Sequence, residues 1–409
     1  MRRSPWILPL LAFAALAPLA GCGADYPLPT ERPRVIGVPT DSSYQMIATW
    51  TGFTGVRDVM LTQGPGTQLF VLFNDGLLAS QPPTAPLTPH GELRLYALAR
   101  PTIIGAPYFL PLASLYSPIG VASAQNKLFV LDEGDSCKAR YDVRRGTCEP
   151  DADTTSATGH PFRHQIFDWQ ATWRVREYPL AGGDTISTFT DSTFARVDGV
   201  AAGEDGYVYV SGIVSVLDTL VTDQRIRTRK FASRVYRYAR GPKYAGLVPD
   251  ALNRDVNMPG SNWHRDTTWV VLDGTGTSSV FDPAGIYYSR FGGHSLFVAD
   301  RGNGAAKQIS VATNGVGFFK VDGSTTGANF NAPDDVFADL NGYFYVLDRG
   351  NRRVLRYDAQ SGEYIQRVDI ENNSDGEPLL DPISIAADDS LVFVADHDRG
   401  KLVKFKRRK

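Results

Sequence analysis

One unit of sequence recurs six times along this chain of 409 residues, and no other feature limits the fold as strongly. In its clearest copy, four short runs rich in β-branched and aromatic residues begin at Pro333, Tyr343, Val354 and Glu363. Turn-forming residues separate these runs, and Asn341-Gly342 is typical of a tight hairpin. The five further copies begin at Val56, Pro118, Val197, Pro283 and Pro382. Six copies of an almost all-strand unit predict an all-β chain folded as a six-bladed β-propeller rather than a sandwich.

The last copy stops after its third strand, which ends at Phe405. A donor for the missing fourth strand lies at the other end of the chain, where residues 44–50 precede the first inner strand. We expect residues 44–50 to complete the last blade and close the ring. This pairing removes a sheet edge that would otherwise invite aggregation.

The repeat resembles the NHL repeat, whose blades read Pro-x-Gly-Ile, a strand, Asp-x-Gly-Asn and then Arg-aliphatic-x-aromatic. The match is close in the copies that begin at Pro283, Pro333 and Pro382 (blades 4, 5 and 6) and fair in the copy that begins at Pro118 (blade 2). It is loose in blades 1 and 3, where Ser211 replaces the aspartate of the family pattern. The resemblance covers about 55–409 and implies an NHL-like six-bladed propeller, but it is weak for function because one fold serves many.

The amino terminus predicts export. Arg2 and Arg3 precede an apolar run that is too short to span a membrane, so residues 1–21 read as a signal peptide. Residues 19–22, Leu-Ala-Gly-Cys, resemble the lipobox of bacterial lipoproteins, which implies that Cys22 is acylated with palmitate and becomes the first mature residue. The alternative is an ordinary signal peptide. Gly23 stands where inner-membrane retention signals of this class often have Asp, so the resemblance implies the outer membrane, on its periplasmic or cell-surface side.

These features divide the chain into a signal peptide at 1–21, a lipid-anchored, proline-rich linker at 22–42 and a propeller at 43–409. Removing the two signal-peptide arginines takes the formal net charge from −2 to −4. A mildly acidic, well-mixed charge argues against a nucleic-acid partner.

With Cys22 lipidated, Cys137 and Cys148 are the one remaining pair, and an oxidising compartment favours a disulfide between them. Metal ligation is the alternative, although CxxC spacing is absent.

Candidate binding residues gather on one face of the predicted ring, where the loops leading to inner strands and those joining strands two and three meet. Three blades carry long insertions there, at 74–91, 133–172 and 212–231, and the longest contains His160 and His164. The short loops of the other three blades bear Arg301, Arg349, His397 and Arg399. We expect these side chains to hold a ligand with negative charge, since guanidinium groups bind carboxylates bidentately. The alternative is that the arginines pair with loop carboxylates such as Asp135 or Asp398.

The first residues of the inner strands add charged groups to the mouth of the channel: Arg57, Asp58, Asp198, Asp334 and Asp335. Their carboxylates offer oxygen ligands for calcium, although turn capping by Asp58 and Asp335 is the simpler interpretation. Asp132, Asp300, Asp348 and Asp396 recur in equivalent places, which favours a structural role. No set of histidines has the spacing of a known metal motif, so we predict no metal site and no cofactor, with calcium as the alternative.

The sequence therefore favours a non-catalytic binding or scaffold protein of the cell envelope, monomeric, whose partner is an envelope protein, a peptide or a glycan. Resemblance to NHL-like propellers implies one alternative, a metal-dependent lyase or lactonase-like enzyme. Enzymes of that kind use histidine ligands on the same face. Here no three histidines fall on matching positions of different blades, so the question of enzyme activity stays open while binding is favoured.

Overall fold

The computed structural model describes residues 44–62, 67–74, 91–98, 115, 118–132, 140–142, 147–149, 173–183, 185–191, 193–218, 228–241, 263–290, 294–312, 317–370, 379–388 and 390–408. The chain forms two compact units, Met1–Thr40 and Asp41–Lys409, and all described residues belong to the second. Cys22, Cys137, His160 and His164 lie outside the described residues, so their predicted roles stay predictions. Within the described part, no helix has the length and apolar character needed to cross a membrane.

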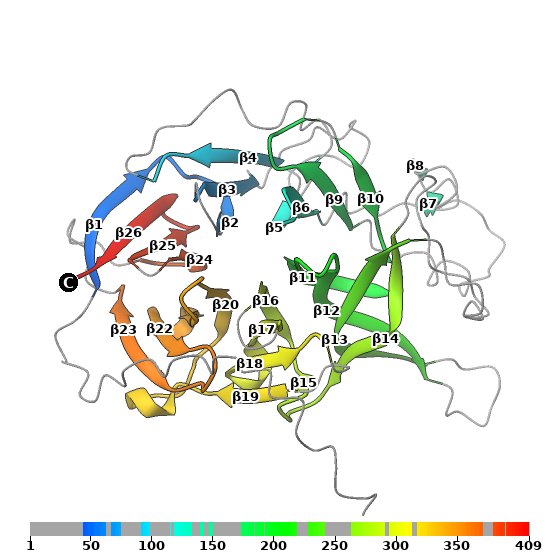
Figure 1. Ribbon diagram of the computed structural model, residues 1–409. Helices are drawn as coiled ribbons and strands as arrows, with labels where there is room; N and C mark the ends of the chain where they lie inside the picture. The colour runs from blue at the N-terminus through cyan, green and yellow to red at the C-terminus, as the bar shows by residue number, and fades with distance from the viewer. Residues whose placement is uncertain are drawn as a thin grey trace, which may run out of the picture. The chain divides into compact units, whose positions relative to one another are not determined.

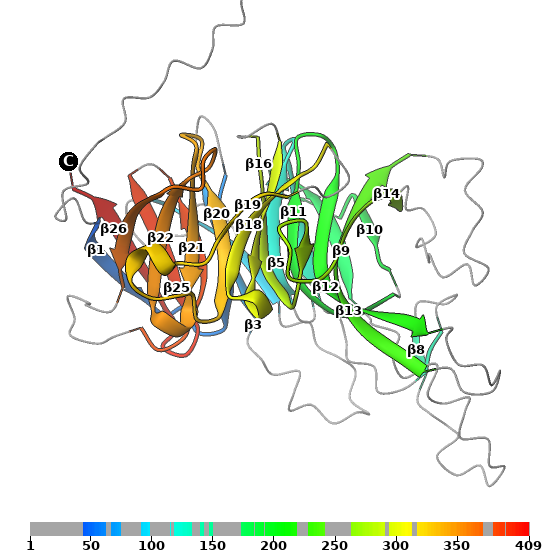
Figure 2. The same cartoon turned by 90° about the horizontal axis from the view of Figure 1, so that it is seen from below.

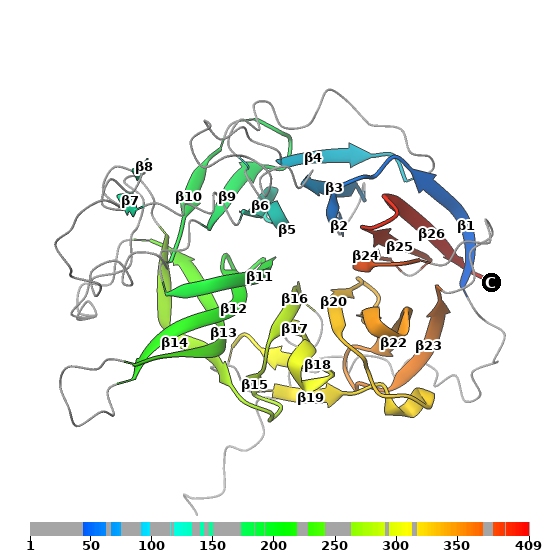
Figure 3. The ribbon, with the colours of Figure 1, turned by 180° about the vertical axis from the view of Figure 1, so that it is seen from behind.

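Six sheets, antiparallel except for the parallel pairing of β15 with β14, stand around a common centre, each with its first strand innermost (Figures 1 and 3). Blade 1 consists of β2 (Val56–Leu61), β3 (Leu69–Asn74) and β4 (Gly91–Tyr96). Blade 2 consists of β5 (Pro118–Ala124), β6 (Lys127–Asp132), β9 (Arg174–Pro179) and β10 (Ser187–Phe189). Blade 3 consists of β11 (Phe194–Ala202), β12 (Val208–Asp218), β13 (Thr228–Arg240) and β14 (Trp263–Asp273), with β15 (Ser279–Val280) at its edge. A short hairpin of β7 (Arg140–Asp142) and β8 (Thr147–Glu149) belongs to the 133–172 insertion and carries Cys148.

The other three blades follow the repeat closely. Blade 4 contains β16 (Pro283–Ser289), β17 (Ser295–Asp300), β18 (Ala305–Ser310) and β19 (Gly317–Val321), and blade 5 contains β20 (Pro333–Ala338), β21 (Tyr343–Asp348), β22 (Arg353–Asp358) and β23 (Tyr364–Asp369). Blade 6 contains β24 (Pro382–Ala387), β25 (Leu391–Asp396), β26 (Lys401–Arg407) and β1 (Tyr44–Thr51). Among the described residues, three 3-10 turns lie between strands: η3 (Arg301–Asn303), η4 (Ser324–Thr326) and η5 (Arg349–Asn351). In side view, the long strands β12 and β13 reach beyond the other blades (Figure 2). The predicted all-β, six-bladed propeller is confirmed.

The ring closes through the pairing of the first and last strands. β1 lies antiparallel to β26, in a register that runs from Tyr44 opposite Arg407 to Thr51 opposite Lys401. Trp50 is buried against Phe393 of β25, with ring centroids 5.9 Å apart. The predicted contribution of residues 44–50 to the last blade is therefore confirmed, and no backbone edge of β26 is left unpaired along this register.

The recurring aspartates at the ends of the second strands hold loops, as predicted. Asp300 accepts the backbone N–H of Phe281 (2.7 Å), and Asp348 accepts that of Asn331 in the same way (2.7 Å). Asp132, Asp300, Asp348 and Asp396 are all fully buried. Buried cations offset part of this charge, for Lys307 lies 2.5 Å from Asp300. These aspartates thus join each blade to the loop before it rather than face a ligand.

Candidate functional site

A cavity of about 260 Å³ occupies the centre of the ring and is lined by the inner strands of all six blades. Each inner strand carries a β-bulge near its start, because the register with the second strand shifts there. Two sets of equivalent residues line the cavity at these bulges. The first ring is Arg57, Ile119, Asp198, Ala284, Asp334 and Ile383, and the second ring is Asp58, Gly120, Gly199, Gly285, Asp335 and Ser384.

Charged side chains alternate around the part of the mouth formed by blades 3 to 6. We call this set the arginine–aspartate chain: Asp198, Asp282, Asp334, Asp381, Arg196, Arg301 and Arg349. Asp334 is its central member, for one carboxylate oxygen accepts from Arg301 Nη1 (2.9 Å) and the other from Arg349 Nη1 (3.1 Å). The sequence predicted Arg301, Arg349, Asp198 and Asp334 at this mouth, and the fold brings them together.

The arginines of this chain are paired, but with other carboxylates than those considered in the sequence. Arg301 donates through Nε to Asp282 (2.9 Å), and Arg349 donates through Nε to Asp381 (2.6 Å). Burial alone would raise the pKa of Asp282, yet hydrogen bonds from Arg301 and Arg196 hold it below its ordinary value. Asp282 and Asp381 directly precede inner strands. The mouth therefore presents fixed, alternating donors and acceptors rather than a patch of free positive charge.

Asp198 stands apart within this chain because its burial is less well compensated. Arg196 Nε lies 2.8 Å from its carboxylate and Arg301 3.7 Å away. Burial nevertheless outweighs these two cations and raises the pKa of Asp198 to about 6. Its charge therefore changes over a mildly acidic range of pH.

Three second-ring residues from neighbouring blades form a continuous hydrogen-bonded group. The hydroxyl of Ser384 in blade 6 lies 2.6 Å from an oxygen of Asp58 in blade 1 and 2.9 Å from an oxygen of Asp335 in blade 5. Each carboxyl also accepts a backbone N–H from the next inner strand: Asp58 from Val121 (2.7 Å) and Asp335 from Ile385 (2.8 Å). The sequence suggested that these aspartates cap turns. Instead, they connect adjacent blades.

The geometry of this group requires a proton in addition to that of the hydroxyl. Ser384 has one hydrogen to donate, and it cannot serve two carboxylates at once. A second proton, carried by one of the two carboxyls, allows the other contact between Ser384 and a carboxyl to be a hydrogen bond as well. Burial, followed by the negative charge of Asp58, raises the pKa of Asp335 well above its ordinary value, which favours the protonated form of this carboxyl. Burial raises the pKa of Asp58 to about 6.

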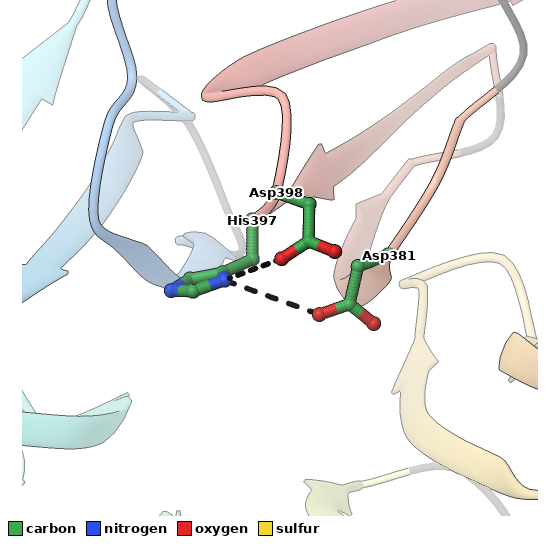
Figure 4. A group of neighbouring side chains, drawn as sticks. All are labelled: Asp381, His397 and Asp398. Carbon is green, nitrogen blue, oxygen red and sulfur yellow. Dashed lines mark hydrogen bonds and ion pairs between the residues drawn. The ribbon is translucent and has the colours of Figure 1, made fainter.

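A group at the rim of blade 6 has the composition of a metal site (Figure 4). His397 Nδ1 lies 3.3 Å from Asp398 and 3.9 Å from Asp381. Within the described residues it is the one set of three metal-ligating side chains whose ligand atoms lie within 4.8 Å of one another. Arg349 holds one oxygen of Asp381, and the other faces the imidazole. Such a donor set suits a divalent cation, and the carboxylates Asp58, Asp198, Asp334 and Asp335 form no comparable set.

The sequence placed His397 at the ligand face and offered Asp398 as a partner for an arginine, but it predicted no metal-ligating group there. The signal that could have found it is the repeat itself. Asp381 precedes the inner strand of blade 6, and His397-Asp398 follows the second strand of the same blade, so both segments meet at one face. Arg399 lies in the β25–β26 turn that this pair begins.

Comparison with known proteins gives similarity of fold. No protein-family model and no curated sequence matches the chain. Among solved structures, the chain is similar to virginiamycin B lyase from Staphylococcus aureus, with 9% identity, a TM-score of 0.45 and coverage of 90% of this chain and 99% of that one. It is similar to PQQ-bound aldose sugar dehydrogenase from Streptomyces coelicolor, with 12% identity, a TM-score of 0.46 and coverage of 91% and 100%. A chain of a nidogen/laminin complex has 11% identity, a TM-score of 0.43 and coverage of 81% and 84%.

Proposed function

We propose that this protein is an NHL-like binding protein of the bacterial cell envelope, held at the outer membrane by an acylated Cys22. Its mouth face takes a peptide, a glycan or a segment of an envelope protein. The monomer binds without catalysis. The observation that carries this proposal is the arginine–aspartate chain, which places charged groups in fixed positions around a central cavity.

Several properties of this chain of charges suit binding. Arg301 and Arg349 keep 28% and 38% of their side-chain surface exposed although aspartates fix both. Each guanidinium carries five N–H groups, and the aspartates use only part of them. Donors and acceptors therefore alternate around the rim, as amide and hydroxyl groups of a ligand require. Because the side chains are already ordered, binding loses little further side-chain entropy.

A pull-down from envelope extract tests the proposal. The variant with Arg301→Ala and Arg349→Ala should recover the partner of the wild-type protein poorly, because both sides of Asp334 lose their donors. Arg94→Ala is the matched control, since Arg94 lies on β4, outside the arginine–aspartate chain, and forms its ion pair with Glu92. We expect the control to recover the partner normally. Equal recovery by the double variant and the wild type would remove this face from consideration.

The group of Asp381, His397 and Asp398 favours a second candidate, a metal-dependent enzyme. A metal assay on the purified mature protein distinguishes the two. Stoichiometric zinc or calcium that is lost in His397→Ala would favour the enzyme, because a scaffold does not need an ion at the rim. Metal content at background level in both proteins would favour the binding protein.

A further inference from the structure

Arg57 differs from the other arginines at the mouth because, among the described residues, its guanidinium has no carboxylate partner. Its Nε is buried and donates no hydrogen bond to any residue that the structure describes. Arg196, Arg301 and Arg349 are all held by aspartates, as described above. Burying a charged donor without an acceptor costs free energy. An acceptor that comes from outside the chain would remove this cost.

The nearest carboxyl along the chain is already engaged elsewhere. Asp58 follows Arg57 directly, but its oxygens accept hydrogen bonds from the backbone of Val59 and Val121 and from the Ser384 hydroxyl. No ion pair joins the two side chains. The positive charge of Arg57 thus remains available to the cavity that it lines.

The surroundings of Arg57 specify what else the ligand must have. In the first ring its neighbours on the flanking blades are Ile119 of β5 and Ile383 of β24, and both line the same cavity. Both isoleucines are only partly buried, so apolar surface is left for a ligand to cover. The cavity volume of about 260 Å³ limits the enclosed portion to a small group.

We propose that Arg57 binds a carboxylate whose short apolar substituent packs on Ile119 and Ile383 in the central cavity. The planar guanidinium matches a carboxylate with two parallel hydrogen bonds, which a lysine ammonium does not reproduce. The ligand is either a small carboxylic acid or the carboxylate-bearing end of a larger molecule. This inference rests on the proposed function, because it assigns the ligand chemistry of the same mouth.

Calorimetric titration of the full-length mature protein with butyrate tests the assignment. Butylamine and butanol have the same chain with a cation or a neutral group, and we expect neither to bind. Arg57→Leu should weaken butyrate at least about tenfold, as loss of a charge-assisted pair does. Arg57→Lys should restore part of the affinity. Ile383→Ala should weaken butyrate more than acetate, because acetate has little apolar surface to lose.

The stability of the variants separates binding from folding. Arg57→Leu removes a half-buried arginine that has no carboxylate partner among the described residues, so it should melt no lower than the wild type. Equal butyrate affinity in wild type and Arg57→Leu, or no butyrate binding to the wild type, would overturn this inference. Either result leaves the proposed function standing, because that is judged by partner recovery with the Arg301 and Arg349 variants.

Discussion

At the scale of residues, the second ring gives one position of the repeat two different uses. In blades 2, 3 and 4 the position is glycine, and a Cβ at Gly285 would collide with the carboxyl of Asp335. In blades 5, 6 and 1 it is Asp335, Ser384 and Asp58, and each side chain accepts a backbone N–H of the next inner strand. Polar bridges thus join four consecutive blades, 5, 6, 1 and 2, around the point where the first and last strands meet. In blades 3 and 4 the glycine lets the next inner strand approach closely, because a Cβ at Gly199 or Gly285 would collide with that strand.

The shared proton of this group predicts a pH dependence of stability. The folded-state pKa values of Asp58 and Asp335 lie above that of an unfolded aspartate, so the folded protein binds more protons between about pH 4 and pH 6 or higher. The free energy of unfolding should therefore fall as the pH rises through this range, by roughly 3 kcal/mol for a shift of about two pKa units.

Urea unfolding at pH 5 and pH 8 measures the part of this fall that lies above pH 5. In Asp335→Gly, which places the residue of blades 2 to 4 in blade 5, the fall between the two pH values should be much smaller. The absolute stability of the variant is not the criterion, because the hydrogen bond to Ile385 is lost as well. An unchanged pH dependence in Asp335→Gly would show that other groups produce it.

At the scale of elements, blade 6 joins the two ends of the propeller. β1 contributes Tyr44 and Trp50 to the core, and the Tyr44 hydroxyl reaches that of Tyr345 in blade 5 (3.2 Å). β1 therefore fixes blade 6 both by backbone pairing and by packing.

Two truncations test the role of β1. Deleting residues 23–42 should leave the melting temperature nearly unchanged, because this segment precedes β1. Deleting 23–52 should lower stability by several kcal/mol and promote aggregation, since β26 then presents an unpaired edge and a buried tryptophan is lost. Thermal melting and light scattering distinguish these results. If both truncated proteins melted alike and stayed monomeric, closure by β1 would not matter for stability.

The insertion that contains β7 and β8 carries the second element-scale prediction. Cys148 lies in β8, and Cys137 precedes β7 in sequence. We expect the two thiols to be joined in protein isolated from the envelope, because no other cysteine follows Cys22. Mass spectrometry of an unreduced digest should find the linked peptides. Separate alkylation of both thiols in native protein would exclude the bond.

The sequence predicted the blades and their closure because alternating strands and turn residues are local signals, repeated six times. It also placed Arg301 and Arg349 correctly, since both follow second strands at the same point of the repeat. It did not predict Asp282 as a partner of Arg301 or Ser384 as a bridge. Those contacts join different blades, and their geometry depends on how the bulges place neighbouring inner strands, which no single copy of the repeat reveals.

At the scale of the whole molecule, one chain carries both the proposed lipid anchor at Cys22 and the proposed binding face of the propeller at 43–409. Cys22→Ser should leave the precursor uncleaved and unlabelled by radioactive palmitate, because the acylated sulfur is absent. After cell fractionation, the Cys22→Ser variant in the membrane fraction should carry no radioactive palmitate. Labelling of the variant at wild-type level would show that the lipid is attached elsewhere or that the signal is of the ordinary kind.

The pairing of β1 with β26 also has a consequence for the order of synthesis. Tyr44 is among the first residues of the propeller to be made, and its partner Arg407 is among the last. Blade 6 therefore cannot be completed until β26 has been made, and until then β1 has no strand to pair with. A loop of this length closes slowly, so the newly made protein passes through an open arc with unpaired strand edges. Any factor that protects the nascent chain must act on that arc.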